Sequence, residues 1–281
     1  MAGEFAALSG NGVQNYKARK KLKLNRLKVG DFVEVDEELL VIERVLPRKN
    51  ELVRPPVANV DMALIVVAPV PSPDFMLIDK LLIKFFALGI EPIILVNKMD
   101  LAKADELFNE ISAQYRDVAK ILGVSAKRGV ESLSSLINIL RDKFTILTGQ
   151  SAVGKTSLLR VLLPNVSMEV GELSAKTARG KNTTRHSEIF VLNNGGMIAD
   201  TPGFSAFELD DFLPEDIIDN TPELARFSGN CKYNNCNHLG ESEQICAVKQ
   251  AVKLGEINID RYNRYCDLFK IAKDKEDKKY E

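Results

Sequence analysis

The fold of this chain is decided by the stretch Gly149-Gln150-Ser151-Ala152-Val153-Gly154-Lys155-Thr156, which fits the pattern G-x-x-x-x-G-K-[ST]. An apolar run at residues 144–148 precedes it, and a helical pattern beginning with Ser157 follows it. Glycines permit a tight turn whose backbone N–H groups point at one phosphate, and the helix N-terminus adds its positive end. The stretch therefore predicts a phosphate-binding loop, in which Lys155 contacts the terminal phosphates and Thr156 binds Mg²⁺. The alternative is a chance Gly-Lys-Thr, which the flanking strand and helix disfavour.

A second motif, Asn97-Lys98-Met99-Asp100, follows an apolar strand at residues 93–96, and so lies where ligands of open α/β sheets bind. The Asp100 carboxylate can accept from guanine's ring N1–H and exocyclic amino group together, whereas adenine has no such donor pair. Lys98 would lie along the base, Asn97 would tie this loop to the phosphate loop, and Ser125-Ala126-Lys127 would offer a backbone N–H to the guanine carbonyl. The tetrapeptide alone is usually a solvated loop, but the combination favours GTP over ATP.

The order of the two motifs is the reverse of that in ordinary guanine-nucleotide-binding domains, so we expect a circularly permuted GTPase. Asp200-Thr201-Pro202-Gly203 ends a predicted strand, where Asp200 can hold Mg²⁺ through water and the Gly203 N–H can meet the γ-phosphate. Residues 171–185 have the composition of a loop, from which Thr183 or Thr184 would close over Mg²⁺. Because the permutation places both segments beside the C-terminal region, loss of the γ-phosphate could pull on that region.

The remaining pattern predicts three parts. Short alternating runs at residues 31–35 and 39–45 indicate a small all-β unit. From residue 62, buried strands alternate with helices, which is typical of a parallel sheet covered on both faces. After residue 204 a mostly helical, cysteine-bearing region begins. We expect strands at 63–68, 92–96, 118–122 and 144–148, helices at 76–88, 105–115 and 131–143, and a hairpin over 188–192 and 197–200.

Three of the four cysteines and one of the two histidines lie close together in the C-terminal region: Cys231, Cys236, His238 and Cys246. Three thiolates and an imidazole suffice for a closed tetrahedral Zn²⁺ shell, which is structural and not catalytic. The alternative, unliganded thiols buried in a helical core, stays open. Cys266 stands apart and is expected to be a core residue, and His186 a solvated loop residue.

Length and composition limit the number of domains and the classes of protein to which this chain can belong. A chain of 281 residues can hold two or three modest domains. The longest apolar stretches are too short to span a bilayer, and the first residues lack the apolar core of a signal peptide, so we expect a cytoplasmic protein without a membrane partner. The net charge of −1 does not indicate a nucleic-acid binder, but one segment is basic and free of acids. It contains Lys17, Arg19, Lys20, Lys21, Lys23, Arg26 and Lys28, and could equally be a solvated face.

With these motifs in place, the chain resembles the circularly permuted GTPases of the RsgA (YjeQ) family, the ribosome small-subunit-dependent GTPases. The likeness runs from about Lys17 to about Phe269 and includes R-P-P-V-A-N-V-D at residues 54–61, C-A-V at 246–248 and Arg261-Tyr262. The resemblance implies a multidomain fold: an OB-type RNA-binding barrel at 1–60, the permuted GTPase at 61–207 and a mostly helical zinc-binding domain at 208–281.

The resemblance also implies a monomeric, GTP-hydrolysing assembly factor with one structural Zn²⁺ and with Mg²⁺ bound alongside GTP. It would contact the rRNA of the small ribosomal subunit, be stimulated by that subunit and act late in its maturation. The basic run at residues 17–28 would then contact the phosphate backbone. A GTP-gated rRNA-binding module with incidental hydrolysis is the alternative, and a GTPase of metabolism or transport fits poorly with a metal module and a basic barrel.

Three features depart from the usual pattern. Phe204 stands where Ras-like enzymes place a water-orienting glutamine, and Asn182 stands where this family usually carries a histidine. Asn182 can bond to water but cannot titrate near neutrality. We therefore expect slow intrinsic turnover, with His186 as a candidate substitute. The N-terminal barrel also has little sequence before Lys17 from which to form its first strands.

Overall fold

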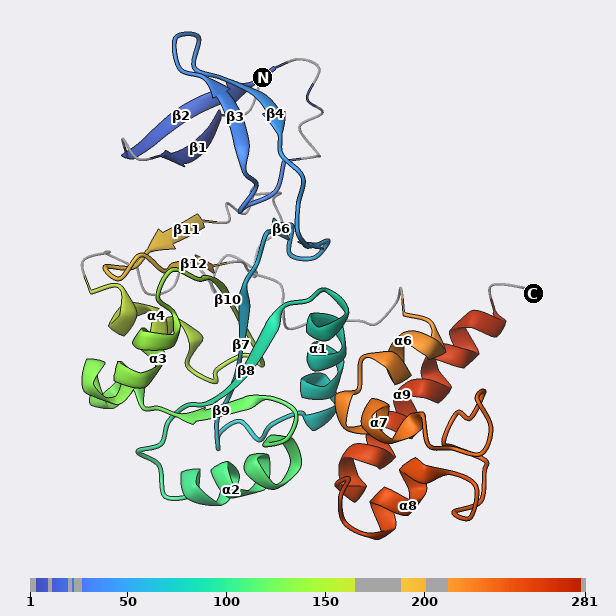
Figure 1. Ribbon diagram of the computed structural model, residues 1–281. Coiled ribbons are helices and arrows are strands. Elements are labelled where there is room, and N and C mark those ends of the chain that lie inside the picture. Colours follow the sequence, from blue (N-terminus) through green and yellow to red (C-terminus); the bar gives the residue numbers. More distant parts are fainter. Residues whose placement is uncertain are drawn as a thin grey trace.

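The computed structural model describes residues 4–9, 12–19, 22, 27–164, 188–200 and 212–278 of the chain. Figure 1 shows three parts in sequence order: a small β-sheet unit, a central sheet flanked by helices, and a C-terminal group of helices. The predicted fold class is confirmed, with N-terminal strands, a central α/β sheet and C-terminal helices that carry a Cys3His cluster. Within the described part of the chain, no helix combines the length and the apolar run that a membrane span requires.

The N-terminal unit is a four-stranded sheet in the order β1-β2-β4-β3. Its strands are β1 (Glu4–Ser9), β2 (Gly12–Ala18), β3 (Val33–Asp36) and β4 (Val41–Val45). The β1–β2 and β3–β4 pairs are antiparallel, whereas β2 and β4 run parallel. Tyr16 and Ile42 are buried, while Leu8 and Val13, which face each other across the first pair, are largely exposed.

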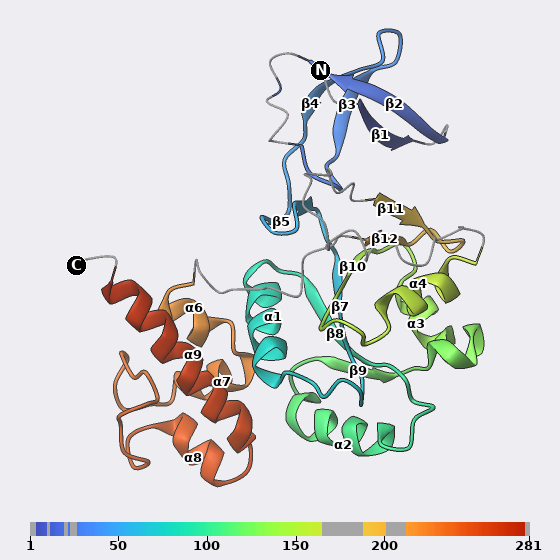
Figure 2. The ribbon, with the colours of Figure 1, turned by 180° about the vertical axis from the view of Figure 1, so that it is seen from behind.

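A short junction fastens this unit to the central sheet. It contains the two-stranded pair β5 (Glu51–Leu52) and β6 (Val57–Ala58). The side chain of Asn50 bonds to both the backbone N–H and the carbonyl of Val60, at 2.9 and 2.8 Å. Leu52 and Val57 are fully buried in the same apolar cluster as the central strands. The junction therefore belongs to the core of the central part. Figure 2 shows β5 between the N-terminal sheet and the central sheet.

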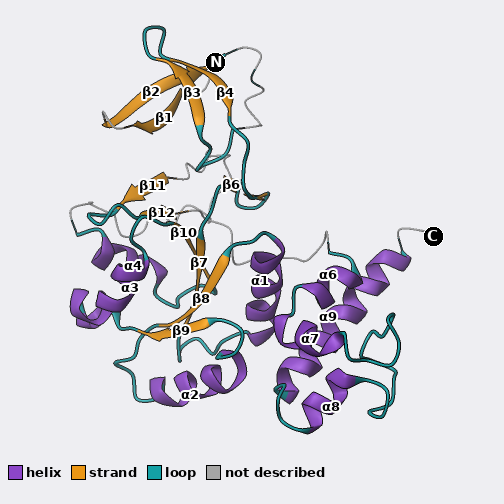
Figure 3. Ribbon diagram, viewed as in Figure 1, coloured by secondary structure: helices purple, strands orange, loops and turns teal. Residues whose placement is uncertain are grey.

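The central sheet has six strands in the order β11-β12-β10-β7-β8-β9. They are β7 (Met62–Val67), β8 (Glu91–Val96), β9 (Lys120–Gly123), β10 (Phe144–Thr148), β11 (Glu188–Val191) and β12 (Met197–Asp200). All neighbours are parallel except β11 and β12, which form the predicted antiparallel hairpin. Figure 3 shows helices on both faces of this sheet, as the alternating pattern predicts.

The two-residue period of β7 sorts its side chains between two separate cores. Ala63, Ile65 and Val67 pack under helices α1 (Phe75–Ala87) and α2 (Ala104–Tyr115). Met62, Leu64 and Val66 pack on the opposite face under α3 (Ser134–Ile139) and α4 (Lys155–Leu162). Since every residue of β7 is buried, the strand reads as a continuous apolar run instead of an alternation.

The C-terminal part comprises α6 (Pro214–Asp219), α7 (Pro222–Ser228), α8 (Ala247–Lys253) and α9 (Ile259–Asp277). These helices form a third apolar cluster, which also includes Ile83 of α1. Helix α1 therefore lies between the sheet and the C-terminal helices, as Figures 1 and 2 show from opposite sides. One helix thus belongs to two cores.

The structure corrects two expectations. The helix expected over residues 131–143 is a 3-10 turn, η3 (Val130–Leu133), followed by α3, which ends at Ile139. Three serines in this segment are weak helix formers, and Asp142 adopts a left-handed conformation (φ 55°) just before β10. The N-terminal sheet also has two strands, β1 and β2, where the short sequence before Lys17 leaves the first strands of the barrel in doubt. Gly10-Asn11 between them in sequence is a hairpin signal that could have revealed them.

Candidate nucleotide and metal sites

The predicted nucleotide motifs follow strands whose carboxyl ends lie at one edge of the central sheet. The phosphate loop follows β10, Asn97 follows β8, and Val124 with Ser125 follows β9. Because β7, β8, β9 and β10 are mutually parallel neighbours in one sheet, these turns all emerge on the same side. Loops far apart in the sequence therefore meet at the edge where open α/β folds bind ligands.

The phosphate loop has a backbone that only glycine fits at two positions. Gly149 has φ +126°, and a Cβ there would lie 2.2 Å from the carbonyl oxygen of Val66. Gly154, with φ +100°, would place a Cβ 2.3 Å from Nδ2 of Asn97. Lys155 opens α4, and its Nζ donates to the carbonyls of Gly149 and Gln150 at 2.8 and 2.6 Å. Lys155 thus lies over its own loop, while Thr156 and Ser157 are exposed at the helix N-terminus.

Asn97 joins three loops through one side chain. Its Nδ2 donates to the carbonyl of Val153 in the phosphate loop at 2.9 Å, which is the link predicted from the sequence. Its Oδ1 accepts from the backbone N–H of Ala126 at 3.2 Å. Asn97 is 1% exposed, so both bonds are shielded from water. Lys98 adds a second link, because its Nζ donates to the carbonyls of Ala152 and Val70 at 2.7 and 2.6 Å.

Asp100 and Ser125 are held together as a pair. The hydroxyl of Ser125 donates to Oδ1 of Asp100 at 2.5 Å, and this bond holds the pKa of that carboxyl below its usual range. Nζ of Lys127 lies 3.8 Å from the other carboxylate oxygen but is largely exposed. The backbone N–H of Ser125 donates to Oγ of Ser132 at 2.8 Å. The carboxylate is therefore charged and oriented, although sequence reasoning did not identify the supporting Ser132.

Several predicted residues cannot be placed at this edge. Thr183, Thr184 and Gly203 lie outside the described residues, as do Asn182, His186 and Phe204. The backbone of Asp200 is described and ends β12, the parallel neighbour of β10. Asp200 therefore stands beside the strand that leads into the phosphate loop.

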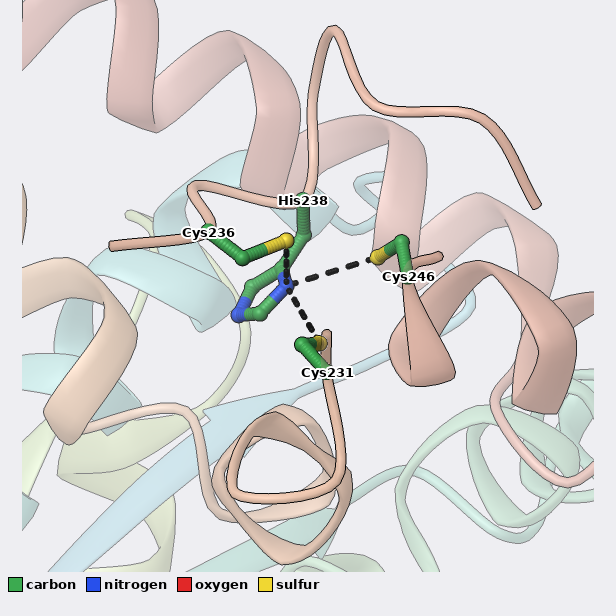
Figure 4. Close-up of side chains that lie close together, drawn as sticks. All are labelled: Cys231, Cys236, His238 and Cys246. Carbon is green, nitrogen blue, oxygen red and sulfur yellow. Dashed lines mark hydrogen bonds between the residues drawn. The ribbon is translucent and has the colours of Figure 1, made fainter. Parts of the chain in front are cut away.

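The second candidate site brings together Cys231, Cys236, His238 and Cys246, whose ligand atoms all lie within 4.8 Å of one another. Nδ1 of His238 lies 3.6, 3.3 and 3.5 Å from the sulfurs of Cys231, Cys236 and Cys246. Figure 4 shows the three sulfurs grouped around this nitrogen. Zn–S and Zn–N bonds of about 2.3 and 2.0 Å at tetrahedral angles imply sulfur–nitrogen separations of about 3.5 Å. The geometry fits a tetrahedral metal ion.

The surroundings also suit a metal ion. Nε2 of His238 lies 3.0 Å from the hydroxyl of Ser228, which leaves Nδ1 directed at the sulfurs. Burial lowers the pKa of His238, so the imidazole is neutral and able to ligate. Burial also raises the pKa of Cys236 to about 12, so a nearby cation is needed to stabilise its thiolate. Cys266 is partly buried against the same apolar cluster and is not in the group.

Comparison with known sequences identifies relatives over the whole chain. The family model described as RsgA GTPase matches residues 45–210. One relative is a protein of Caldanaerobacter subterraneus subsp. tengcongensis named small ribosomal subunit biogenesis GTPase RsgA. It is 38% identical over 288 residues, and the match covers 100% of this chain and 96% of the relative. A protein of the same name from Bacillus subtilis is 39% identical over 264 residues, with coverage of 91% and 87%.

Solved structures agree with the sequences. The crystal structure of YjeQ from Thermotoga maritima superposes with a TM-score of 0.81 at 32% identity, covering 96% of this chain and 94% of the other. The crystal structure of YloQ, described as a circularly permuted GTPase, gives a TM-score of 0.78 at 32% identity, with coverage of 98% and 92%. The similarity therefore extends over the N-terminal sheet, the central sheet and the C-terminal helices alike.

Proposed function

Since this chain belongs to the RsgA GTPase family and is a GTP-hydrolysing enzyme, we propose that it acts in late maturation of the small ribosomal subunit. Relatives that match it over nearly their whole length are named as biogenesis GTPases of that subunit. On this proposal the partners are the small subunit, its rRNA and GTP or GDP. The protein acts as a monomer in the cytoplasm.

One observation carries the assignment of the nucleotide site: the bonds of Asn97 to Val153 and Ala126. They hold the base-reading loop, the phosphate loop and the Ser125–Lys127 turn in one cluster, so a single nucleotide can span them. Asp100 would accept from the guanine N1–H and amino group, and the Ala126 N–H would turn from Asn97 to the guanine carbonyl. At 3.2 Å its present bond is at the long end of the normal range.

The phosphate end follows the same logic. Lys155 would leave the carbonyls of Gly149 and Gln150 and contact the terminal phosphates, because its ammonium group is attracted more strongly to a charged phosphate oxygen than to a neutral carbonyl. Mg²⁺ prefers oxygen ligands, and the groups proposed to hold it are the exposed hydroxyl of Thr156 and the carboxylate of Asp200. Thr183 or Thr184 and Gly203 are proposed to close over Mg²⁺ and the γ-phosphate.

The two outer parts have supporting roles. We assign a structural Zn²⁺ to Cys231, Cys236, His238 and Cys246, because a closed set of three thiolates and one imidazole matches that ion's preference. Lys17 and Arg19, both exposed at the end of β2, are proposed to contact rRNA phosphates together with the following lysines.

The substitution Lys155→Ala tests the cycle. The variant lacks the ammonium group that would stabilise the negative charge developing on the phosphates during hydrolysis. GTP hydrolysis is therefore expected to slow about 100-fold or more. Cosedimentation with small subunits, in the presence of GTP or GDP, should then show the variant retained on the subunit after GTP is added. Lys120→Ala removes an exposed lysine of β9 at the amino end of the sheet and should release subunits as the unchanged protein does.

The outcome separates two functions. Retention of Lys155→Ala on the subunit supports an enzyme whose hydrolysis drives release. Normal release by Lys155→Ala would instead favour a GTP-gated rRNA-binding module with incidental hydrolysis, a role compatible with Phe204 and Asn182 near the predicted γ-phosphate segments. Failure of the unchanged protein to cosediment in either nucleotide state would contradict both.

A further inference from the structure

The start of helix α1 is hydrogen-bonded to the phosphate loop. The backbone N–H of Asp74 donates to Oε1 of Gln150 at 2.9 Å, and Gln150 is the second residue of that loop. The Asp74 carboxylate also caps α1, because its Oδ1 accepts from the N–H of Leu77 at 3.0 Å. A shift of the first turn of α1 would therefore move a side chain of the loop proposed to hold the phosphates.

Arg264 of α9 packs on this same turn. Its guanidinium lies 5.3 Å from the ring centroid of Phe75, the first residue of α1. Its Nη2 donates to Oε1 of Gln114 in α2 at 2.7 Å, and its Nε donates to Oδ2 of Asp79 at 2.5 Å. The ring of Phe75 stacks in turn on Tyr115, with centroids 6.4 Å apart and planes inclined by 5°. One arginine thus fixes the N-terminal half of α1 against the end of α2.

Asp79 anchors this arrangement in a dry environment. Its side chain is 3% exposed and accepts from the hydroxyl of Tyr115 at 2.6 Å and from Arg261 of α9. Arg261 is 5% exposed and pairs also with Glu223 of α7. The two carboxylates and two guanidinium groups balance in charge. Because displacing Arg261 or Arg264 would take a partner from the buried carboxylate of Asp79, the contact between α9 and α1 resists movement.

Helix α9 also holds the loop at residues 231–246, which carries the candidate metal ligands and is called the metal loop here. The hydroxyl of Tyr262 donates to the carbonyl of His238 at 2.6 Å, and that of Tyr265 donates to the carbonyl of Asn237 at 3.0 Å. These two tyrosines and the two arginines lie within five consecutive residues, 261–265. A continuous set of bonds therefore leads from the metal loop through α9 and α1 to the phosphate loop.

We propose that Arg264 is a positioning residue for the nucleotide site, and that α1 and α9 couple occupancy of the phosphate loop to the order of the metal loop. The inference rests on the nucleotide site proposed above. Coupling of binding free energies is reciprocal, so a nucleotide must order the metal loop as much as that loop favours the nucleotide. The coupling bypasses residues 201–211, which connect β12 to α6 in sequence.

Binding of a fluorescent GDP analogue to the full-length protein tests the first half of the proposal. Arg264→Ala is expected to weaken GDP affinity about fivefold or more, at the low end of known couplings. Arg264→Lys keeps a charge for Asp79 and should recover part of the loss. Phe75→Leu removes the ring under Arg264 without touching Asp79, and should weaken GDP binding even if Arg264→Ala does not fold.

Glu223→Gln is the matched control. Within the described residues Glu223 pairs with Arg261 and has no hydrogen bond or ion pair to α1, so the variant should lower the melting temperature and leave GDP affinity unchanged. Hydrogen exchange of residues 231–246 tests the other half: GDP should slow it in the unchanged protein and not in Arg264→Ala.

Three results would overturn the proposal: wild-type GDP affinity in folded Arg264→Ala and Phe75→Leu, an equal loss in Glu223→Gln, or exchange at residues 231–246 that GDP does not alter. Absence of GDP binding by the unchanged protein would instead remove the proposed function itself.

Discussion

At the proposed nucleotide site, single side chains would set the chemistry of the base-binding end. Asp100 is charged and oriented because Ser125 donates to it, and Ser125 is itself held by Ser132. A carboxylate presented in this way matches a pair of neighbouring donors, which guanine has and adenine lacks. At the proposed site, base choice would therefore depend on Asp100, a residue whose surroundings keep it ionised.

Asp100→Asn should change which purine is bound. The amide keeps the size of the side chain but replaces one acceptor with a donor, so guanine's amino group would meet an N–H. GTP affinity is expected to fall about 100-fold, whereas XTP, which has a carbonyl at that position, should gain. Calorimetry with GTP, XTP and ATP measures the change. Asp105→Asn, at an exposed acid in the first turn of α2, should behave like the unchanged protein, and GTP affinity preserved in Asp100→Asn would contradict the assigned role.

Helix α1 is the element that most constrains the molecule. Its Leu81 packs in the core beneath the central sheet, while Ile83 packs among the C-terminal helices. The two side chains are two residues apart and point to different faces of the same helix. A helix with two buried faces has only a narrow solvent-exposed face, so few of its positions tolerate substitution.

Truncation of these two residues should weaken different parts of the protein. Leu81→Ala and Ile83→Ala are each expected to cost about 2–5 kcal/mol of local stability, because a cavity is left in a packed core. Hydrogen exchange resolved by segment should show faster exchange in β7 and β8 for Leu81→Ala, and in α6 and α9 for Ile83→Ala. Identical exchange patterns in the two variants would show that α1 does not separate two cores.

At the scale of the whole molecule, we expect the C-terminal helices to depend on the proposed metal ion more than the sheet does. The loop carrying Cys231, Cys236 and His238 is held mainly by α8, α9 and the expected ion, and few buried apolar side chains belong to it. The central sheet has its own two cores. Loss of the metal ion should therefore unfold the C-terminal part around the metal loop and leave the central sheet intact.

Metal removal gives a direct test. Cys236→Ser removes one ligand and should yield protein with well under one Zn²⁺ per chain by elemental analysis, whereas Cys266→Ser, outside the cluster, should retain one. Chelator treatment should raise hydrogen exchange at residues 231–246 and in α8 while exchange in β7 and β10 stays slow, because binding free energy in such sites is folding free energy. Full zinc content in Cys236→Ser would refute the assignment.

The whole-molecule view bears on one expectation about signalling, which stays a prediction because residues 201–211 lie outside the described part of the chain. The sequence suggested that loss of the γ-phosphate could pull on the C-terminal region through the segment after Asp200. The structure shows that region fastened to α1 by buried ion pairs of Asp79 with Arg261 and Arg264, and to α2 by the hydrogen bond from Arg264 to Gln114. Any pull through residues 201–211 would have to work against that contact.

The sequence alone determined the features that depend on local spacing. The glycines of the phosphate loop, the strand before it and the Asn97–Asp100 turn are contiguous, and turns of this kind require particular residues at fixed offsets. The same holds for the strands of the central sheet and for its helices other than the one expected over residues 131–143, because periodicity is a local property. The metal ligands also lie within one short segment, so their grouping could be read from spacing.

Only the tertiary structure decided contacts between distant segments. Asp79 and Arg261 are 182 positions apart, and nothing in either local sequence indicates that they pair. The motif predicts that Asn97 meets the phosphate loop, but the structure alone shows that its Oδ1 also accepts from Ala126, 29 positions away, because parallel strands bring their carboxyl ends to one edge. Such contacts form when apolar faces pack and leave no water to solvate the polar groups between them. Packing, which no local pattern encodes, thus supplies the bonds that position the motifs.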